Sequence, residues 1–129
     1  MDIKYPTEQQ IIDANEYVLE TIRVRKADRH KVLTPERITG AIQLAQNEDG
    51  DLYAKAAVLV SSLTKGHAFD SGNRRTAVSV AETFLNSNGE NVNLVHNPNV
   101  LQGIREGFYT KDEIKQWLKG VEIRPFKRL

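Results

Sequence analysis

The stretch from Leu52 to Lys65 constrains the fold of this chain most strongly. Its apolar residues recur at helical spacing and leave one face almost free of polar side chains, which predicts a helix buried at the centre of the domain. The same period recurs elsewhere in the chain, in residues 8–22, 35–45, 76–88, 98–107 and 110–119. We therefore predict an all-α fold, a compact bundle of about six helices.

Cap residues mark most of the expected helix boundaries. Pro35 stands at the first helical position of the second segment, directly after Thr34. Before the last segment, Thr110 and Glu113 have the spacing of a capping box. Gly66 follows the central segment, so we expect this glycine to be the C-terminal cap that ends the helix.

The composition is that of one small domain without a strong electric field. The 129 residues suffice for one core and are too few for two, so we treat residues 1–129 as a single domain. The formal net charge of +1 argues against direct binding to nucleic acid or to a membrane, and it disfavours a helical DNA-binding domain. The chain has no cysteine, which excludes disulfides and thiolate metal sites.

The segments outside the expected helices carry few signals. The N-terminus lacks the basic region and apolar run of a signal peptide, so we expect a soluble, cytoplasmic protein. Residues 23–34 are charged and without periodicity, which is typical of a connecting loop that leaves His30 at the surface. We expect His96 in a turn, and the basic tail, residues 121–129, to be flexible or to contact a partner.

Unusual chemistry is concentrated in residues 66–77, GHAFDSGNRRTA, between two helical segments. His67 offers an imidazole, the side chain best suited to accept a proton near neutral pH. Residues 72–75 form a glycine-containing turn into the helix expected from Thr76, and their N–H groups, the helix dipole and two guanidinium groups make an anion site, most readily for phosphate. From the residues alone, a base beside a phosphate cradle and a plain polar turn with solvated arginines both remain open.

The spacing of this loop resembles the active-site signature of the Fic/Doc superfamily. The residues that match in register are His67, Phe69, Gly72, Asn73 and Arg75. The resemblance implies that His67 is the catalytic base for an accepting hydroxyl, that Phe69 positions the loop, and that Arg75 offsets charge during the transfer. It also implies that nucleotide phosphates are bound by Gly72, Asn73, Arg74 and Arg75.

Two positions depart from the family pattern. Ser71 stands where the family has the acidic residue that holds Mg²⁺, and Asp70 lies one place earlier. A metal would therefore depend on Asp70 or Ser71 together with the nucleotide phosphates. Arg74 stands where AMP-transferring members have glycine and Doc toxins have lysine. A long cation there fills space that the AMP-transfer pose needs for the remaining phosphates, which favours transfer of the terminal phosphate.

The resemblance implies a Doc-like toxin of a toxin–antitoxin pair. Such a protein would transfer phosphate from a nucleoside triphosphate to a hydroxyl of a target such as a translation elongation factor. We expect ATP as the co-substrate and Mg²⁺ as a cofactor bound with it. An antitoxin acting in trans is the other expected partner, and we expect a monomer or weak dimer. Two alternatives stay open: an AMP transferase of the Fic type, and a binding module that has lost catalysis because of Ser71.

The family also has a flap that aligns the target segment by strand-like pairing. In this chain the flap would fall near residues 46–51. The same residues fit a polar turn that ends in an N-cap at Asp49 or Asp51. The sequence does not decide between the two interpretations.

Overall fold

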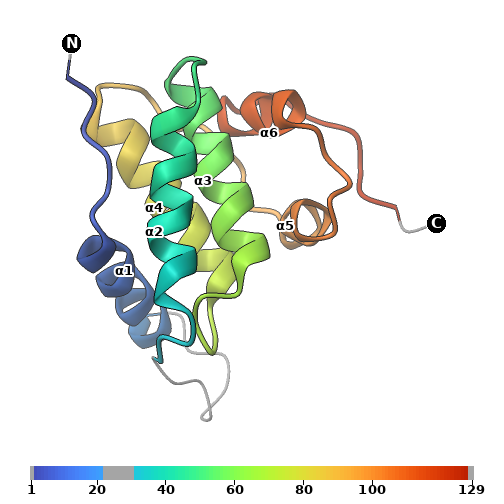
Figure 1. The fold of residues 1–129 in the computed structure, drawn as a ribbon. Coiled ribbons are helices and arrows are strands. Elements are labelled where there is room, and N and C mark those ends of the chain that lie inside the picture. Colours follow the sequence, from blue (N-terminus) through green and yellow to red (C-terminus); the bar gives the residue numbers. More distant parts are fainter. Residues whose placement is uncertain (1, 22–30, 128–129) are drawn as a thin grey trace.

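The computed structural model describes residues 2–21 and 31–127, and over these ranges it is all-α, as the periodicity predicts (Figure 1). Its helices are α1 (Glu8–Thr21), α2 (Pro35–Asn47), α3 (Leu52–Gly66), α4 (Asn73–Ser87), α5 (Pro98–Arg105) and α6 (Lys111–Leu118). The described residues hold no β-strand beyond one isolated bridge. The prediction of six helices in a compact bundle is therefore confirmed.

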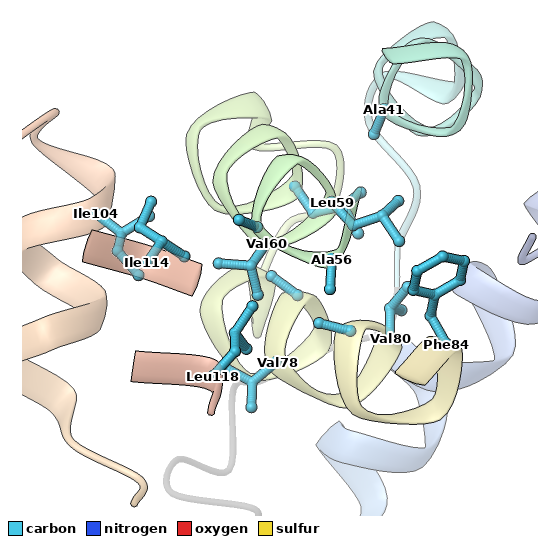
Figure 2. Packing of buried hydrophobic residues seen from close by; sticks show 14 of the residues in the cluster. Ala41, Ala56, Leu59, Val60, Val78, Val80, Phe84, Ile104, Ile114 and Leu118 are labelled. Carbon is cyan, nitrogen blue, oxygen red and sulfur yellow. The ribbon is translucent and has the colours of Figure 1, made fainter. Parts of the chain in front are cut away.

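Helix α3 is the centre of the bundle, as expected from its apolar face. It packs against α2, α4, α5 and α6, while α1 lies against α4 and α2 (Figure 1). In Figure 2, Leu59 and Val60 of α3 lie between Ala41 of α2 on one side and Ile104 and Ile114 of the C-terminal helices on the other. Small residues at the contact between α3 and α4 allow the two backbones to approach closely. These residues, none more than 1% exposed, are Ala56, Ala57, Ala77 and Ala81.

The turn between α2 and α3 is a capped polar turn without strand structure. The Asp51 carboxylate accepts the N–H of Ala54 at 2.8 Å, which identifies Asp51 as the N-cap of α3. The ammonium of Lys55, a residue only 7% exposed, donates to the carbonyls of Ala45 and Glu48. These bonds satisfy the carbonyls at the end of α2 inside the turn, so residues 46–51 do not extend into a strand.

Strand-like pairing occurs instead beside the loop that follows α3. Val32 and Phe69 form an antiparallel bridge. The N–H of Leu33 donates to the carbonyl of Ala68 at 2.8 Å, and the N–H of Asp70 donates to the carbonyl of Lys31 at 2.9 Å. Most of the loop predicted over residues 23–34, including His30, lies outside the described residues, but its last residues are thus fastened to the loop that carries His67.

Residues 121–127 of the basic tail pack against the connection between α5 and α6. Arg124 donates to the Glu113 carboxylate at 2.6 Å, and its guanidinium lies 3.9 Å from the centre of the Phe108 ring. The hydroxyl of Tyr109 donates to the carbonyl of Arg124 at 3.0 Å, and the ring of Phe126 meets that of Phe108 edge to face. A tail that was expected to be flexible or to bind a partner is therefore docked on its own domain over the residues described.

The Glu113–Arg124 contact makes stability depend on pH. The hydrogen bond from Arg124, followed by the bond from the Thr110 N–H, lowers the pKa of Glu113 below its ordinary value. Because the pKa of Glu113 is lower in the folded state than in the unfolded state, the contribution of this contact to stability is complete above the ordinary carboxyl pKa. The contribution is lost as the pH falls through the folded-state pKa. We predict that Glu113→Gln has a lower melting temperature than wild type at pH 7, because the neutral side chain loses the ion pair with Arg124 but keeps an oxygen that can accept the Thr110 N–H. This difference in melting temperature should disappear at acidic pH.

Thermal melts from neutral to acidic pH test this prediction. The matched control is Glu122→Gln, which removes an exposed carboxylate from the tail that carries Arg124. A difference between Glu113→Gln and wild type that does not change with pH would contradict the prediction.

Candidate active site

His67 ends α3 in a conformation that non-glycine residues rarely adopt. The helix continues through Gly66, and it is His67 that has the left-handed backbone, with φ 49° and ψ 49°. The prediction that Gly66 is the C-terminal cap was therefore wrong by one residue. Among the described residues His67 is the one non-glycine residue with positive φ. This conformation costs about 1–2 kcal/mol, so the surrounding contacts must hold the backbone of His67 in place.

The first of these contacts is the burial of Phe69. Its side chain is 1% exposed and belongs to the main core, as the sequence analysis expected. The Asn73 amide binds the Phe69 backbone twice: the Phe69 N–H donates to Oδ1 at 3.0 Å, and Nδ2 donates to the Phe69 carbonyl at 2.9 Å. These two bonds fix the orientation of the amide. Asn73, expected to orient a phosphate, thus clamps the loop that carries His67.

The same amide also approaches the imidazole. Asn73 Nδ2 lies 3.4 Å from His67 Nδ1. Because the amide orientation is fixed, the amide is the donor in this contact and Nδ1 the acceptor. At 3.4 Å this contact is long for a hydrogen bond, so it restrains the imidazole only weakly.

A buried asparagine of α1 supports the loop from the other side. Asn15 is fully buried, and its Nδ2 donates to the carbonyl of Ser71 at 2.8 Å and to the Thr76 hydroxyl at 3.1 Å. In the sequence Asn15 stands out only as a polar residue on an apolar helix face, and nothing there indicates which residue it binds. The structure identifies it as the residue that ties α1 to the start of α4.

Gly72 is required by both its conformation and its surroundings. Its φ of 77° is left-handed, and a Cβ at this position would lie 3.0 Å from Leu19 Cδ2 and 3.3 Å from Asn15 Nδ2. Glycine therefore allows α1 to lie directly against the loop. After Gly72 the helix begins at once: α4 starts at Asn73, three residues before the predicted start at Thr76.

The earlier helix start changes the character of the anion site. Asn73, Arg74 and Arg75 now occupy the first turn of a 15-residue helix. The N–H groups of a first helical turn have no acceptors within the helix, and the helix dipole places partial positive charge there. Gly72 at the N-cap has no side chain that could accept a bond from them. Backbone donors and guanidinium groups therefore coincide at one helix end, a favourable arrangement for binding phosphate.

A cavity of about 340 Å³ brings the predicted site residues together. Its lining includes all of them except Phe69, which lies in the core below: His67, Asp70, Ser71, Gly72, Asn73, Arg74 and Arg75. Four further lining residues were not predicted: Val18, Leu19, Thr64 and Arg105. Val18 and Leu19 belong to α1, Thr64 to α3 and Arg105 to the last turn of α5. Among the residues that the structure describes, the cavity thus has three guanidinium groups and a single carboxylate, which favours an anionic ligand.

The residues of the cavity fit a phosphate-bearing ligand better than a metal held by protein alone. Thr64 lines the cavity, and its buried hydroxyl oxygen has no hydrogen-bond partner among the described residues. In residues 2–21 and 31–127 no group of three acidic, histidine or cysteine side chains could hold a metal ion. Asp70 is the one carboxylate among the described residues of the lining. This set fits a Mg²⁺ that takes most of its ligands from phosphate oxygens.

The other histidine within the described residues takes no part in the site. His96 lies beside Glu82, with Nε2 3.3 Å from Oε1, and its side chain is 70% exposed. It lines a neighbouring surface hollow between α1 and α4, which shares Val18 and Arg75 with the cavity. The sequence analysis expected it in a turn without a ligand role, and it lies in the loop before α5.

The loop after α3 thus combines a histidine with left-handed backbone, a glycine N-cap and two arginines in the first turn of the next helix. The chain belongs to the Fic/DOC family, whose model matches residues 5–85 and so covers all of α1 to α3, the loop and most of α4. It is also similar to a protein called Toxin Doc from Mycolicibacterium smegmatis, with 53% identity over 38 residues. That match spans 30% of this chain and 29% of the relative.

The helices give no sign of a membrane segment. No helix in the described part of the chain is both long enough and apolar enough to cross a bilayer.

We predict that Asn15→Leu destabilises the protein by about 1–3 kcal/mol, because the Ser71 carbonyl and the Thr76 hydroxyl would lose a buried donor. Chemical denaturation measures the effect. Tyr17→Ala on the same helix is the control, since its side chain is 65% exposed and should change the unfolding free energy by no more than about 0.5 kcal/mol. Equal stabilities of the two variants would refute the role assigned to Asn15.

A pair of glycine variants separates backbone strain from close packing at the loop. Gly72 and Gly89 both have positive φ, but a Cβ at Gly89 meets nothing within 4 Å. We predict that Gly89→Ala costs about 1 kcal/mol from strain alone, while Gly72→Ala costs a further 1–3 kcal/mol, roughly, because Leu19 and Asn15 must move. Denaturant unfolding of both variants measures the difference, and equal costs would show that α1 does not press on the loop.

Proposed function

We propose that this chain is a Doc-like toxin that transfers the terminal phosphate of a nucleoside triphosphate to a hydroxyl group of a target protein. The observation that carries the proposal is the convergence, in one cavity, of His67 with the arginine-bearing first turn of α4. Membership of the Fic/DOC family and the similarity to Toxin Doc support the same direction. ATP is the expected co-substrate, and a translation elongation factor is the expected target.

In this proposal the chain positions two reactants and moves one proton. The imidazole of His67 takes the proton from the target's Ser or Thr hydroxyl, the hydroxyl oxygen forms a bond to the terminal phosphorus, and the nucleoside diphosphate departs with the electrons of the broken bond. The N–H groups of the first turn of α4 and the guanidinium of Arg75 bind the phosphate oxygens and offset the charge that builds up on them. Mg²⁺ would neutralise phosphate charge, with Asp70 its protein ligand.

The position of Arg74 supports transfer of phosphate over transfer of AMP. Arg74 lines the cavity, and its guanidinium is held by a 2.7 Å hydrogen bond to Gln102 Oε1. A long, tethered cation at this place reduces the room for the β- and γ-phosphates that the AMP-transfer pose would put there. Fic-type AMP transfer is thus the alternative chemistry, and the product distinguishes the two.

A nucleotide-binding module without catalysis is the second candidate. It is favoured by Ser71, whose hydroxyl is a weaker ligand for Mg²⁺ than a carboxylate and whose carbonyl is already bound by Asn15. Such a protein would bind nucleotide at the start of α4 and modify nothing. Antitoxin control in trans is proposed only for the active toxin, and it predicts that a co-expressed partner relieves growth arrest.

The test of the proposed function is intact-mass analysis of translation factors, and then of whole lysate, after incubation with the protein, Mg²⁺ and mixed nucleoside triphosphates. A gain of one phosphate on a protein would establish the kinase. A gain of a nucleoside monophosphate would instead establish AMP transfer. If no protein gains mass while nucleotide still binds, the binding module is correct.

We predict that replacing His67 abolishes the modification and the growth arrest without unfolding the protein. His67→Asn is the better variant, because asparagine tolerates the left-handed backbone that His67 has, whereas His67→Ala adds strain. Both variants should be assayed for growth inhibition and melting temperature. A fully toxic His67→Asn variant would refute the role of His67 as base.

A further inference from the structure

Helix α5 contributes Arg105 to the cavity lining, although it lies beyond residues 5–85, the part that the family model matches. We propose that Gln102 and Arg105 of α5 adapt the site to the phosphate chain of a nucleoside triphosphate and discriminate against ligands with one phosphate. Arg105 would bind the chain directly, and Gln102 would be a positioning residue that acts through Arg74. This inference rests on the proposed function, because it specifies the ligand of the same cavity.

A chain of two hydrogen bonds holds Arg74 against α5. Arg74 Nη1 donates to Gln102 Oε1 at 2.7 Å, and Gln102 Nε2 donates to Glu106 Oε2 at 2.6 Å. The Glu106 carboxylate can only accept, so it fixes the Gln102 amide with its oxygen toward Arg74. Arg74 is therefore positioned by a neutral acceptor, which retains the charge of the guanidinium for an anionic ligand. A carboxylate in place of Gln102 would neutralise that charge.

Arg105 adds a third guanidinium to the cavity. It stands three residues after Gln102, so the two side chains share one face of the helix. Arg105 is exposed, lines the cavity, and forms no ion pair with the residues described. It lies in the last turn of α5, where the helix dipole favours a cation.

The charges of the cavity match a longer phosphate chain than a single phosphate group. Arginine binds phosphate oxygens in pairs through its planar fork, so each guanidinium can engage a separate pair of oxygens. The first turn of α4 with Arg75 suffices for one phosphate, which leaves Arg74 and Arg105 for its neighbours in the chain.

Titration calorimetry of the full chain tests the inference, with a non-hydrolysable ATP analogue, tripolyphosphate, AMP and inorganic phosphate as ligands. We expect Arg105→Ala to weaken binding of the ATP analogue and of tripolyphosphate by about tenfold or more, the loss expected for a charge-assisted bond, with AMP and phosphate little changed. Arg105→Lys should recover part of the affinity. Arg37→Ala, which removes an exposed arginine of α2 outside the cavity, is the charge-matched control.

Gln102 is tested by the charge of its replacement. Gln102→Glu should weaken triphosphate binding more than Gln102→Ala does, because only the glutamate neutralises Arg74. A structural role of Gln102 would affect triphosphate and monophosphate ligands alike. The inference is overturned if Arg105→Ala and Arg37→Ala lower the affinity equally, or if every ligand is affected to the same degree.

The ratio of triphosphate affinity to monophosphate affinity, together with the test for protein modification, also distinguishes this inference from the proposed function. Triphosphate selectivity that depends on Arg105, without modification of any protein, would support the inference and refute the kinase. Phosphate transfer with normal triphosphate affinity in Arg105→Ala would support the kinase and refute the inference.

Discussion

The paired hydrogen bonds between the Asn73 side chain and the Phe69 backbone are the constraint on which the site depends. They join the loop after α3 to the first turn of α4, and the buried ring of Phe69 anchors that junction in the core. Because both ends of the loop are held, few backbone conformations remain for His67, and it adopts the left-handed one. Burial of the Phe69 ring stabilises the fold by more than the left-handed backbone of His67 costs, so core packing can hold this backbone in place.

Residues of the helices on both sides of this loop complete the cavity. α1 contributes Asn15 and the apolar residues beside Gly72, and α5 contributes Gln102 and Arg105. Neither helix carries a residue of the family signature. The signature therefore describes the groups expected to act on phosphate, whereas the shape and charge around them come from segments distant in the chain. Residues of α5 therefore contact the site without belonging to the loop that carries the signature.

Helix content and helix caps were predictable because both depend on neighbouring residues. The spacing of apolar residues identified all the helices, and the capping box of Thr110 and Glu113 is present as expected. The errors concern the helix boundaries on either side of the active-site loop, where the cap is His67 and α4 begins at Asn73. Between the flap and the capped turn near residues 46–51 the sequence did not decide, and the structure has a turn there that is capped by Asp51 and held by Lys55, with strand-like pairing at Val32 and Phe69. A carbonyl's partner ten or more residues away leaves no periodic signal in the sequence.

The sequence by itself determined the all-α class, the buried central helix and a loop whose residues suit proton transfer and phosphate binding, since each follows from local spacing and side-chain chemistry. Only the tertiary structure decided that the left-handed residue is His67 and not Gly66, that Asn73 clamps the loop, and that Asn15, Thr64 and Arg105 belong to the site. The physical reason is that these roles depend on packing between helices. Two side chains 30 or 60 residues apart become neighbours only when the core has fixed the positions of the helices that carry them.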